Sequence, residues 1–224
     1  MALIPTLVAI GLGTWLGLRW GGSFANLRRW RPVLPAIGLG GISLMVINDM
    51  VGPGGTPGVL VLLVALALVT AFAVLNLATG GMVLVAAGFG LNLLVTLLNW
   101  GMPVSTSALV SSGLATDESE ALALSLNGGR EVADGALLGF LGDVIPLPWG
   151  QVLSLGDLVW LTGLALVTAS VLRRYEVRSA HRGPRRSTRG TGGYSQSLSA
   201  LGRGPAPRRG PGLHPSRLGE RRGR

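Results

Sequence analysis

The sequence predicts an all-α integral membrane protein with about five transmembrane helices, one long outer loop and a disordered basic C-terminal tail. Of the 224 residues, 48% are hydrophobic and only 13% are charged, about half the share of charge in a typical soluble domain. The apolar residues form long runs, as helices surrounded by lipid require. Charge is segregated, because residues 1–172 carry five Arg and eight acids whereas residues 173–224 carry fourteen Arg and two Glu.

The composition also excludes several kinds of site. The chain has no cysteine, which excludes disulfides, thiolate metal sites and thiol nucleophiles. Both histidines, His181 and His214, lie in the basic tail, so residues 1–172 offer no imidazole to a metal or a proton relay. We therefore expect neither a cofactor nor a metal site.

The first two helices are expected at residues 2–18 and 33–50. Positive charge follows the first run, at Arg19, whereas a signal peptide carries it before the apolar core, so we expect an uncleaved transmembrane helix. Glycines spaced four apart would let a second helix approach closely: Gly13, Gly17 and Gly21. The second run ends in Asn48-Asp49, where a carboxylate is most simply interfacial.

The third and fourth helices are expected at residues 58–77 and 81–100. The fourth carries Asn92, Thr96 and Asn99, which fall on one helix face. Polar groups facing lipid are costly, so this face should look into protein. Two interpretations stay open, interhelical hydrogen bonding and a polar pocket near the outer end of the helix.

The outer loop is expected at residues 101–153 and holds six acids and one Arg. A helix start is predicted at Thr116 to Glu120, where a capping hydroxyl precedes acids in the first turn. The simplest interpretation of the loop is a solvated segment with a short surface helix. The fifth helix, 154–172, begins with Ser154-Leu-Gly-Asp157, a capping-box pattern with Asp in place of Glu or Gln.

The polytopic domain, residues 1–172, is followed by the Arg-, Gly- and Pro-rich tail, residues 173–224, which cannot bury a core and is predicted to be disordered. Three arginines just past the membrane could contact anionic lipid: Arg173, Arg174 and Arg178. The tail has only two aromatic residues, Tyr175 and Tyr194, and no recognisable motif, which argues against nucleic-acid binding.

Charge and helix number predict one orientation. Positive charge marks the cytoplasmic side, and it follows the first helix and the fifth. Five crossings place both regions on one side. We therefore expect a multi-pass protein of the cell membrane with its N-terminus outside, its C-terminus in the cytoplasm and the acidic loop outside.

Two segments of the chain are distinctive, GLNLLVTLLNWGMPV at residues 90–104 and FLGDVIPLPWGQVLSLGDLVWLTGLAL at residues 140–166. With them, the chain resembles a family of bacterial membrane proteins known as domain of unknown function 5317. The resemblance covers roughly residues 1–172 and implies a polytopic bacterial membrane protein. It implies no activity. A more basic or His-bearing segment is expected before Leu-Gly-Asp in that family, where this chain has Asn-Gly-Gly-Arg-Glu.

Two hypotheses about function follow. In the first, which we favour, the protein has a structural or interaction role, packs with itself or a protein partner, and uses Asp143 and Asp157 as turn and cap residues. In the second, it is a small transporter or membrane enzyme with an outward-facing polar pocket lined by Asn92, Asn99, Asp143 and Asp157. The sequence has no phosphate loop, Ser–His pair or zinc signature, which argues against the second hypothesis.

Overall fold

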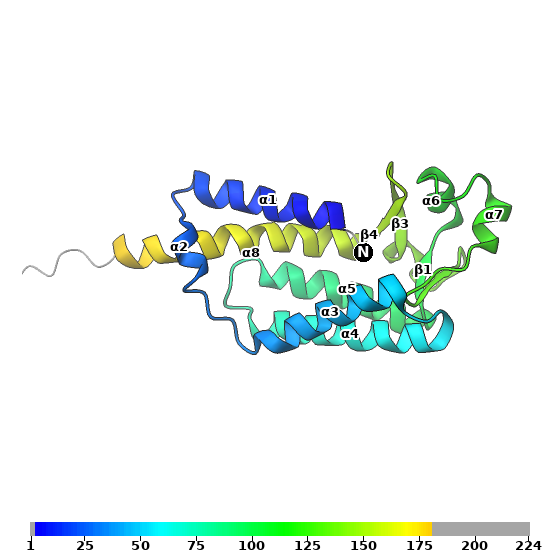
Figure 1. Ribbon diagram of the computed structural model, residues 1–224, viewed down its shortest axis with the longest axis horizontal. Helices are drawn as coiled ribbons and strands as arrows, with labels where there is room; N and C mark the ends of the chain where they lie inside the picture. Colours follow the sequence, from blue (N-terminus) through cyan, green and yellow to red (C-terminus); the bar gives the residue numbers. More distant parts are fainter. Residues whose placement is uncertain (1–2, 181–224) are drawn as a thin grey trace, which may run out of the picture. The chain divides into compact units, whose positions relative to one another are not determined.

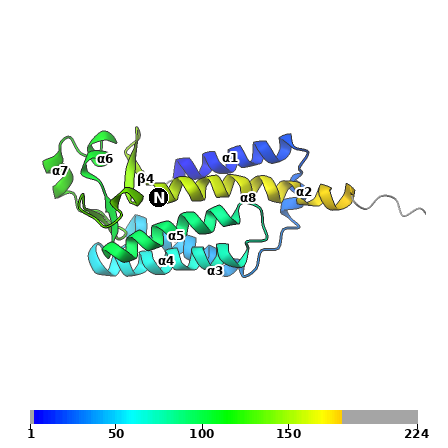
Figure 2. The same ribbon diagram turned by 180° about the vertical axis from the view of Figure 1, so that it is seen from behind.

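The computed structural model describes residues 3–180, and side chains as far as Arg173. Within this range five long helices lie side by side, and a small sheet with two short helices lies at one end of them (Figures 1 and 2). In chain order the elements are α1 Leu3–Arg19, α2 Phe24–Leu27, α3 Pro35–Val51, α4 Gly55–Leu75, α5 Met82–Asn99, β1 Met102–Val104, α6 Thr106–Ser111, α7 Glu118–Ala123, β2 Arg130–Val132, the 3-10 turn η1 Gly139–Leu141, β3 Asp143–Leu147, β4 Gln151–Ser154 and α8 Leu155–Ala180.

Three helices within the described range are long and apolar enough to cross a membrane: Gly55–Leu75, Met82–Asn99 and Leu155–Arg173. The other two long helices, α1 and α3, are apolar but have 17 residues each, which gives about 26 Å at 1.5 Å per residue. The protein is thus mostly helical with three candidate spans, and the prediction of five spans is met for three of them.

The long helices pack as a row. Helix α8 lies between α1 and α5, and α4 lies between α5 and α3. Glycines permit two of these approaches, because a Cβ added at Gly17 would lie 2.8 Å from Cδ1 of Leu172, and one at Gly88 would lie 2.5 Å from the backbone nitrogen of Trp160. The close approach expected of the first helix is therefore made to α8.

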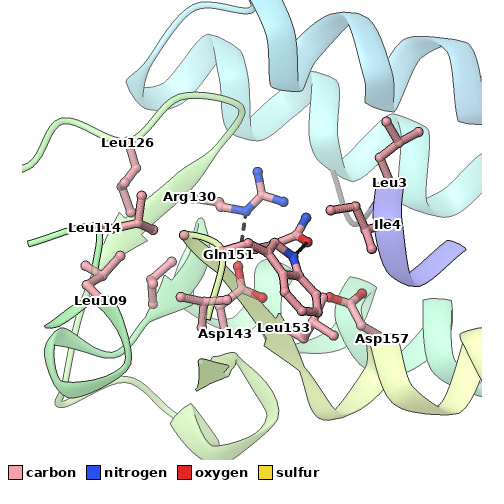
Figure 3. A pocket seen from close by; sticks show the side chains of 14 residues that line it. Leu3, Ile4, Leu109, Leu114, Leu126, Arg130, Asp143, Gln151, Leu153 and Asp157 are labelled. Atoms are coloured by element: carbon pink, nitrogen blue, oxygen red, sulfur yellow. Dashed lines mark hydrogen bonds and ion pairs between the residues drawn. The ribbon is translucent and has the colours of Figure 1, made fainter. Parts of the chain in front are cut away.

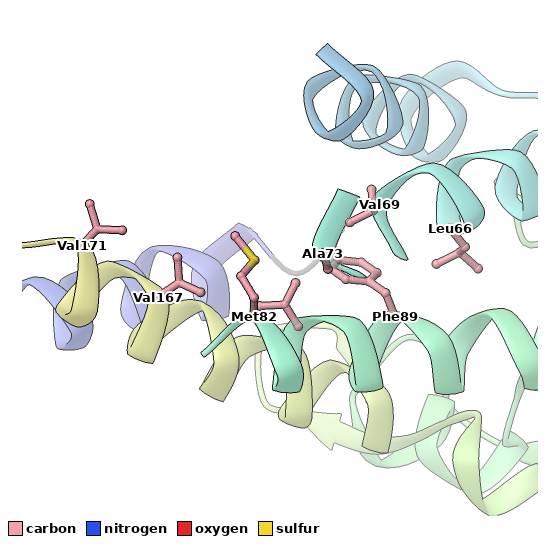
Figure 4. Packing of buried hydrophobic residues seen from close by; sticks show 8 residues of the cluster. Leu66, Val69, Ala73, Met82, Phe89, Val167 and Val171 are labelled. Atoms are coloured by element: carbon pink, nitrogen blue, oxygen red, sulfur yellow. The ribbon is translucent and has the colours of Figure 1, made fainter. Parts of the chain in front are cut away.

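One apolar cluster fills the space between α4, α5 and α8 (Figure 4). Phe89 of α5 stacks on Trp160 of α8 with ring centroids 5.0 Å apart. Helices in lipid gain little from the hydrophobic effect, so side-chain packing of this kind holds the row together. The buried members are Leu66, Val69, Ala73, Met82, Val85, Phe89, Val167 and Val171.

The segment predicted as an outer loop contains a four-stranded sheet of order β2-β1-β3-β4. Strand β1 is parallel to β2 and β3, and β3 pairs with β4 in an antiparallel hairpin that turns at residues 148–150. We call residues 101–154 the head. The all-α class is therefore correct only for the helical part of the protein.

The strands were missed because their residues look like loop residues. They have three to five residues each, too few to show the alternation that identifies a strand. A proline inside a strand is unusual because it has no N–H to donate, but β3 pairs with β1 only at Asp143, so no bond from Pro146 to β1 is missing. Helix α7 does begin where a helix start was predicted, with Asp117 as its N-cap in place of Thr116.

At the end of the row opposite the head, polar side chains fix the connections. The Nδ2 of Asn26 donates to the carbonyl of Leu172 at 2.5 Å, and the Arg173 guanidinium lies 5.0 Å from the centre of the Trp20 ring. Helix α8 continues to Ala180, so residues 173–180 of the predicted tail are helical. The predicted disorder of residues 181–224 lies outside the described residues.

Candidate functional site

The head is joined to the helices by a guanidinium between two carboxylates. Arg130 starts β2 and Asp143 starts β3, on either side of β1. The Nε of Arg130 donates to Oδ2 of Asp143 at 3.1 Å, and its Nη1 donates to Oδ1 of Asp49 at the end of α3. One side chain thus links two strands of the head to a long helix.

Burial and ion pairing together determine the pKa values of Asp143 and Arg130. Asp143 is only 3% exposed, and burial raises the pKa of its carboxyl to about 7 although the Arg130 charge pulls it down. Burial lowers the pKa of Arg130, but Asp143 and Asp49 raise it by more, so it lies above its ordinary value. Arg130 is therefore always charged, whereas Asp143 can hold a proton near neutral pH.

A second polar group joins α5 to the start of α8. The Nδ2 of Asn92 donates to Oδ1 of Asp157 at 2.9 Å, and Oγ of Ser154 donates to Oδ1 of Asn92 at 2.9 Å. Asp157 also accepts from Nε1 of Trp160 at 2.9 Å. Ser154 and Asp157 close the predicted capping box, since each accepts a hydrogen bond from the other's backbone N–H, at 2.9 and 3.2 Å.

Asn99 lies in a separate arrangement. Its Oδ1 accepts from the backbone N–H of Leu137 at 2.7 Å, and its Nδ2 donates to the carbonyls of Leu137 and Val95 at 2.9 and 2.8 Å. Asn99 therefore clamps the segment before η1 onto the end of α5. None of these hydrogen bonds reaches Asn92, Asp143 or Asp157, so the polar residues predicted on one face of the fourth helix take part in two separate hydrogen-bond networks.

A cavity of about 460 Å³ lies between the head and the start of α1. In Figure 3, Leu109, Leu114 and Leu126 stand on one side and Leu3 and Ile4 on the other, with Arg130 and Asp143 between them. Its lining residues are Leu3, Ile4, Val104, Leu109, Leu114, Leu126, Arg130, Asp143, Trp149, Gly150, Gln151, Val152, Leu153 and Asp157.

Of the four residues predicted to form a pocket, Asp143 and Asp157 line this cavity, and Asn92 and Asn99 do not. Sequence reasoning missed Arg130 and Asp49. The available signal was that Arg130 is the only basic residue between residues 32 and 172, a long stretch for a chain so rich in Arg elsewhere. Among the side chains that the structure describes, no three of His, Cys, Asp or Glu are grouped closely enough to hold a metal ion.

A family model described as a family of unknown function, DUF5317, matches residues 30–169. No curated protein and no solved structure matches the chain.

Proposed function

Because this chain belongs to the family of unknown function DUF5317, whose description carries no activity, we propose its role from the geometry of the described residues. We propose a structural or interaction role in a bacterial cell membrane. The observation that carries the proposal is that all four polar residues expected to line a site are bonded to other parts of the same chain: Asn92, Asn99, Asp143 and Asp157.

Hydrogen bonds of this kind are expected where polar side chains hold parts of the fold together. A buried polar network whose members are satisfied by one another rigidifies the elements that carry them, and it leaves few groups for a substrate. Here Arg130 holds the strands to α3, Asn92 and Ser154 hold α5 to α8, and Asn99 holds the segment before η1 to α5. The head is thereby fixed on the helices at several independent points.

The same geometry supports a five-span topology with the N-terminus outside and the C-terminus in the cytoplasm. Arg19 and the arginines after it lie at the same end of the row as Arg173, because Asn26 and Trp20 contact the end of α8. The head, which holds six of the chain's acids, lies at the other end. Positive charge on the cytoplasmic side then puts the head outside.

The arrangement of the helices also indicates which partners the protein can contact. Helices α1 and α3 end the row, so their outer faces are open to the lipid bilayer or to a second copy of the chain. Arg173 stands at the cytoplasmic end in this topology and, with Arg174 and Arg178, would contact anionic lipid. Vesicles with and without anionic lipid test this contact, which should weaken when the three arginines are replaced by Gln and when salt is raised.

The test of the structural role is the substitution Asp143→Leu. It removes both oxygens that can accept hydrogen bonds from Arg130, so we expect less full-length protein in the membrane and faster proteolysis of the head. The matched change Glu118→Leu affects an exposed acid of the head and should leave both unchanged. Normal abundance and normal protease resistance of the Asp143→Leu protein would contradict a structural role for this pair.

One observation favours a second candidate function, a small transporter or membrane enzyme with an outward-facing pocket. The cavity of about 460 Å³ falls in the size range of small-molecule sites, and it combines apolar walls with Arg130, Asp143 and Asp157. A ligand that stabilises the purified protein and fails to do so once the cavity is filled by Leu114→Phe would support this function.

A further inference from the structure

The walls of the cavity between the head and α1 are mostly aliphatic, which sets the body of any molecule that fits. Leu109, Leu114 and Leu126 of the head face the cavity from one side, and Leu3 and Ile4 of α1 from the other (Figure 3). Leu3 and Ile4 are also 67% and 47% exposed, so this wall continues onto the outer surface of an apolar helix. A molecule with an aliphatic chain could lie along this wall and reach the charged residues with its head group.

The charged residues that line the cavity are two acids and one arginine. Asp143 and Asp157 line it, and Arg130, the only cation among its described lining residues, is paired with Asp143 and with Asp49 behind it. Asp157 makes no salt bridge with any described residue, so its negative charge has no counter-ion among them. A phosphate or carboxylate group would be repelled by Asp157, whereas a positive charge would be attracted.

The residues near the cavity favour an ammonium group over a metal ion. No group of three or more potential metal ligands occurs among the described side chains of residues 3–173, so these carboxylates are spread too widely to surround a metal ion. An ammonium group needs only one or two carboxylates and an aromatic face. Trp149 lines the cavity and supplies that face, and its Nε1 donates to Oε1 of Gln151 at 3.1 Å.

We propose that the cavity between the head and α1 binds an organic ammonium ion with an aliphatic body, its charge beside Asp157 and Asp143 and its chain against Leu3, Ile4 and the leucines of the head. This inference rests on the second candidate function and is independent of the structural role. The ammonium group could belong to a free amine or to the amine head group of a membrane lipid.

The probe is octylamine, added to the purified full-length protein in nanodiscs of phosphatidylcholine. Octanol and octanoate have the same chain without the positive charge and serve as matched probes. We expect octylamine alone to raise the unfolding temperature and to change tryptophan fluorescence. If octanoate or octanol stabilises the protein equally, the cavity binds ligands but the ammonium class is wrong. If none of the three has an effect, both the inference and the second candidate function are overturned.

Two variants locate the effect. Asp157→Asn removes one charge and should weaken octylamine binding at least about tenfold, while Asp134→Asn, outside the cavity, should not weaken it. Leu114→Phe narrows the cavity at a side chain that is 43% exposed, so it keeps the test valid if Asp157→Asn does not fold. Octylamine binding that survives Leu114→Phe unchanged would overturn the proposed location.

A final arm separates the two sources. Nanodiscs that contain phosphatidylethanolamine present an amine head group at high local concentration. Loss of the octylamine effect in these nanodiscs would support the lipid as the natural ligand. An octylamine effect of the same size in both nanodiscs would support a free amine. Both results support the ammonium class.

Discussion

Replacing Arg130 by Met tests the link between the head and the helices. Methionine keeps most of the side-chain volume and removes the charge, so the buried Asp143 loses its salt bridge and Asp49 loses one of its partners. Removing one partner of a buried ion pair costs about 3–5 kcal/mol. The side chain of Arg130 is 33% exposed and Asp143 can take up a proton, so we expect the lower end, about 3 kcal/mol.

That loss corresponds to a fall of roughly 6–12 °C in the unfolding temperature for a domain of this size. Tryptophan fluorescence of the detergent-solubilised protein would measure it, and the exposed Arg31→Met is the matched control. Adding Asp143→Leu to Arg130→Met should recover part of the loss, because an apolar pair leaves no unpaired charge at that position. An Arg130→Met protein that unfolds within 2 °C of the natural one, a margin under about 1 kcal/mol, would refute the reasoning.

Three further predictions concern other parts of the chain. Asn99→Ala removes three hydrogen bonds and should speed proteolysis at Leu137, which mass spectrometry of the fragments would detect. Gly88→Val should abolish folded protein in detergent because its Cβ has no room beside α8, whereas Gly90→Ala, with open space around it, should not. Because burial raises the pKa of Asp143 to about 7, the folded state binds a proton that the unfolded state lacks, so stability should rise as pH falls from 8 towards 5. The slope from this group is at most about 1.4 kcal/mol per pH unit, and an Asp143→Asn protein that kept it would show that another group is responsible.

The helices and their local contacts could be predicted from the sequence. Long apolar runs identify helices because each run has many residues, and the Ser154 to Asp157 capping box lies within four consecutive residues. That Asn92 faces protein also follows from a physical rule, since an amide in a membrane helix needs a protein partner, although the rule does not identify Asp157 as that partner. In each case the signal lies within one helix or at its end.

The head and the Arg130 group could not be predicted in the same way. Arg130 and Asp49 are 81 positions apart, so their pairing depends on the path of the chain between them. The strands are too short to show a pattern, and β1 and β2 pair in parallel across a long connection. Asn99 lies on the same helix face as Asn92 but one end of that face meets the head, so a shared face did not mean a shared site.

The central claim is that the long helices lie in the membrane and the head lies in water, and a comparison of two exposed apolar residues tests it most directly. Leu122 in the head is 65% exposed and Val64 in the middle of α4 is 52% exposed. The chain has no cysteine, so each can be replaced singly by Cys without background labelling. In intact cells a membrane-impermeant thiol reagent should label Leu122→Cys and leave Val64→Cys unlabelled, even after lysis. Labelling of both at similar rates would contradict the claim.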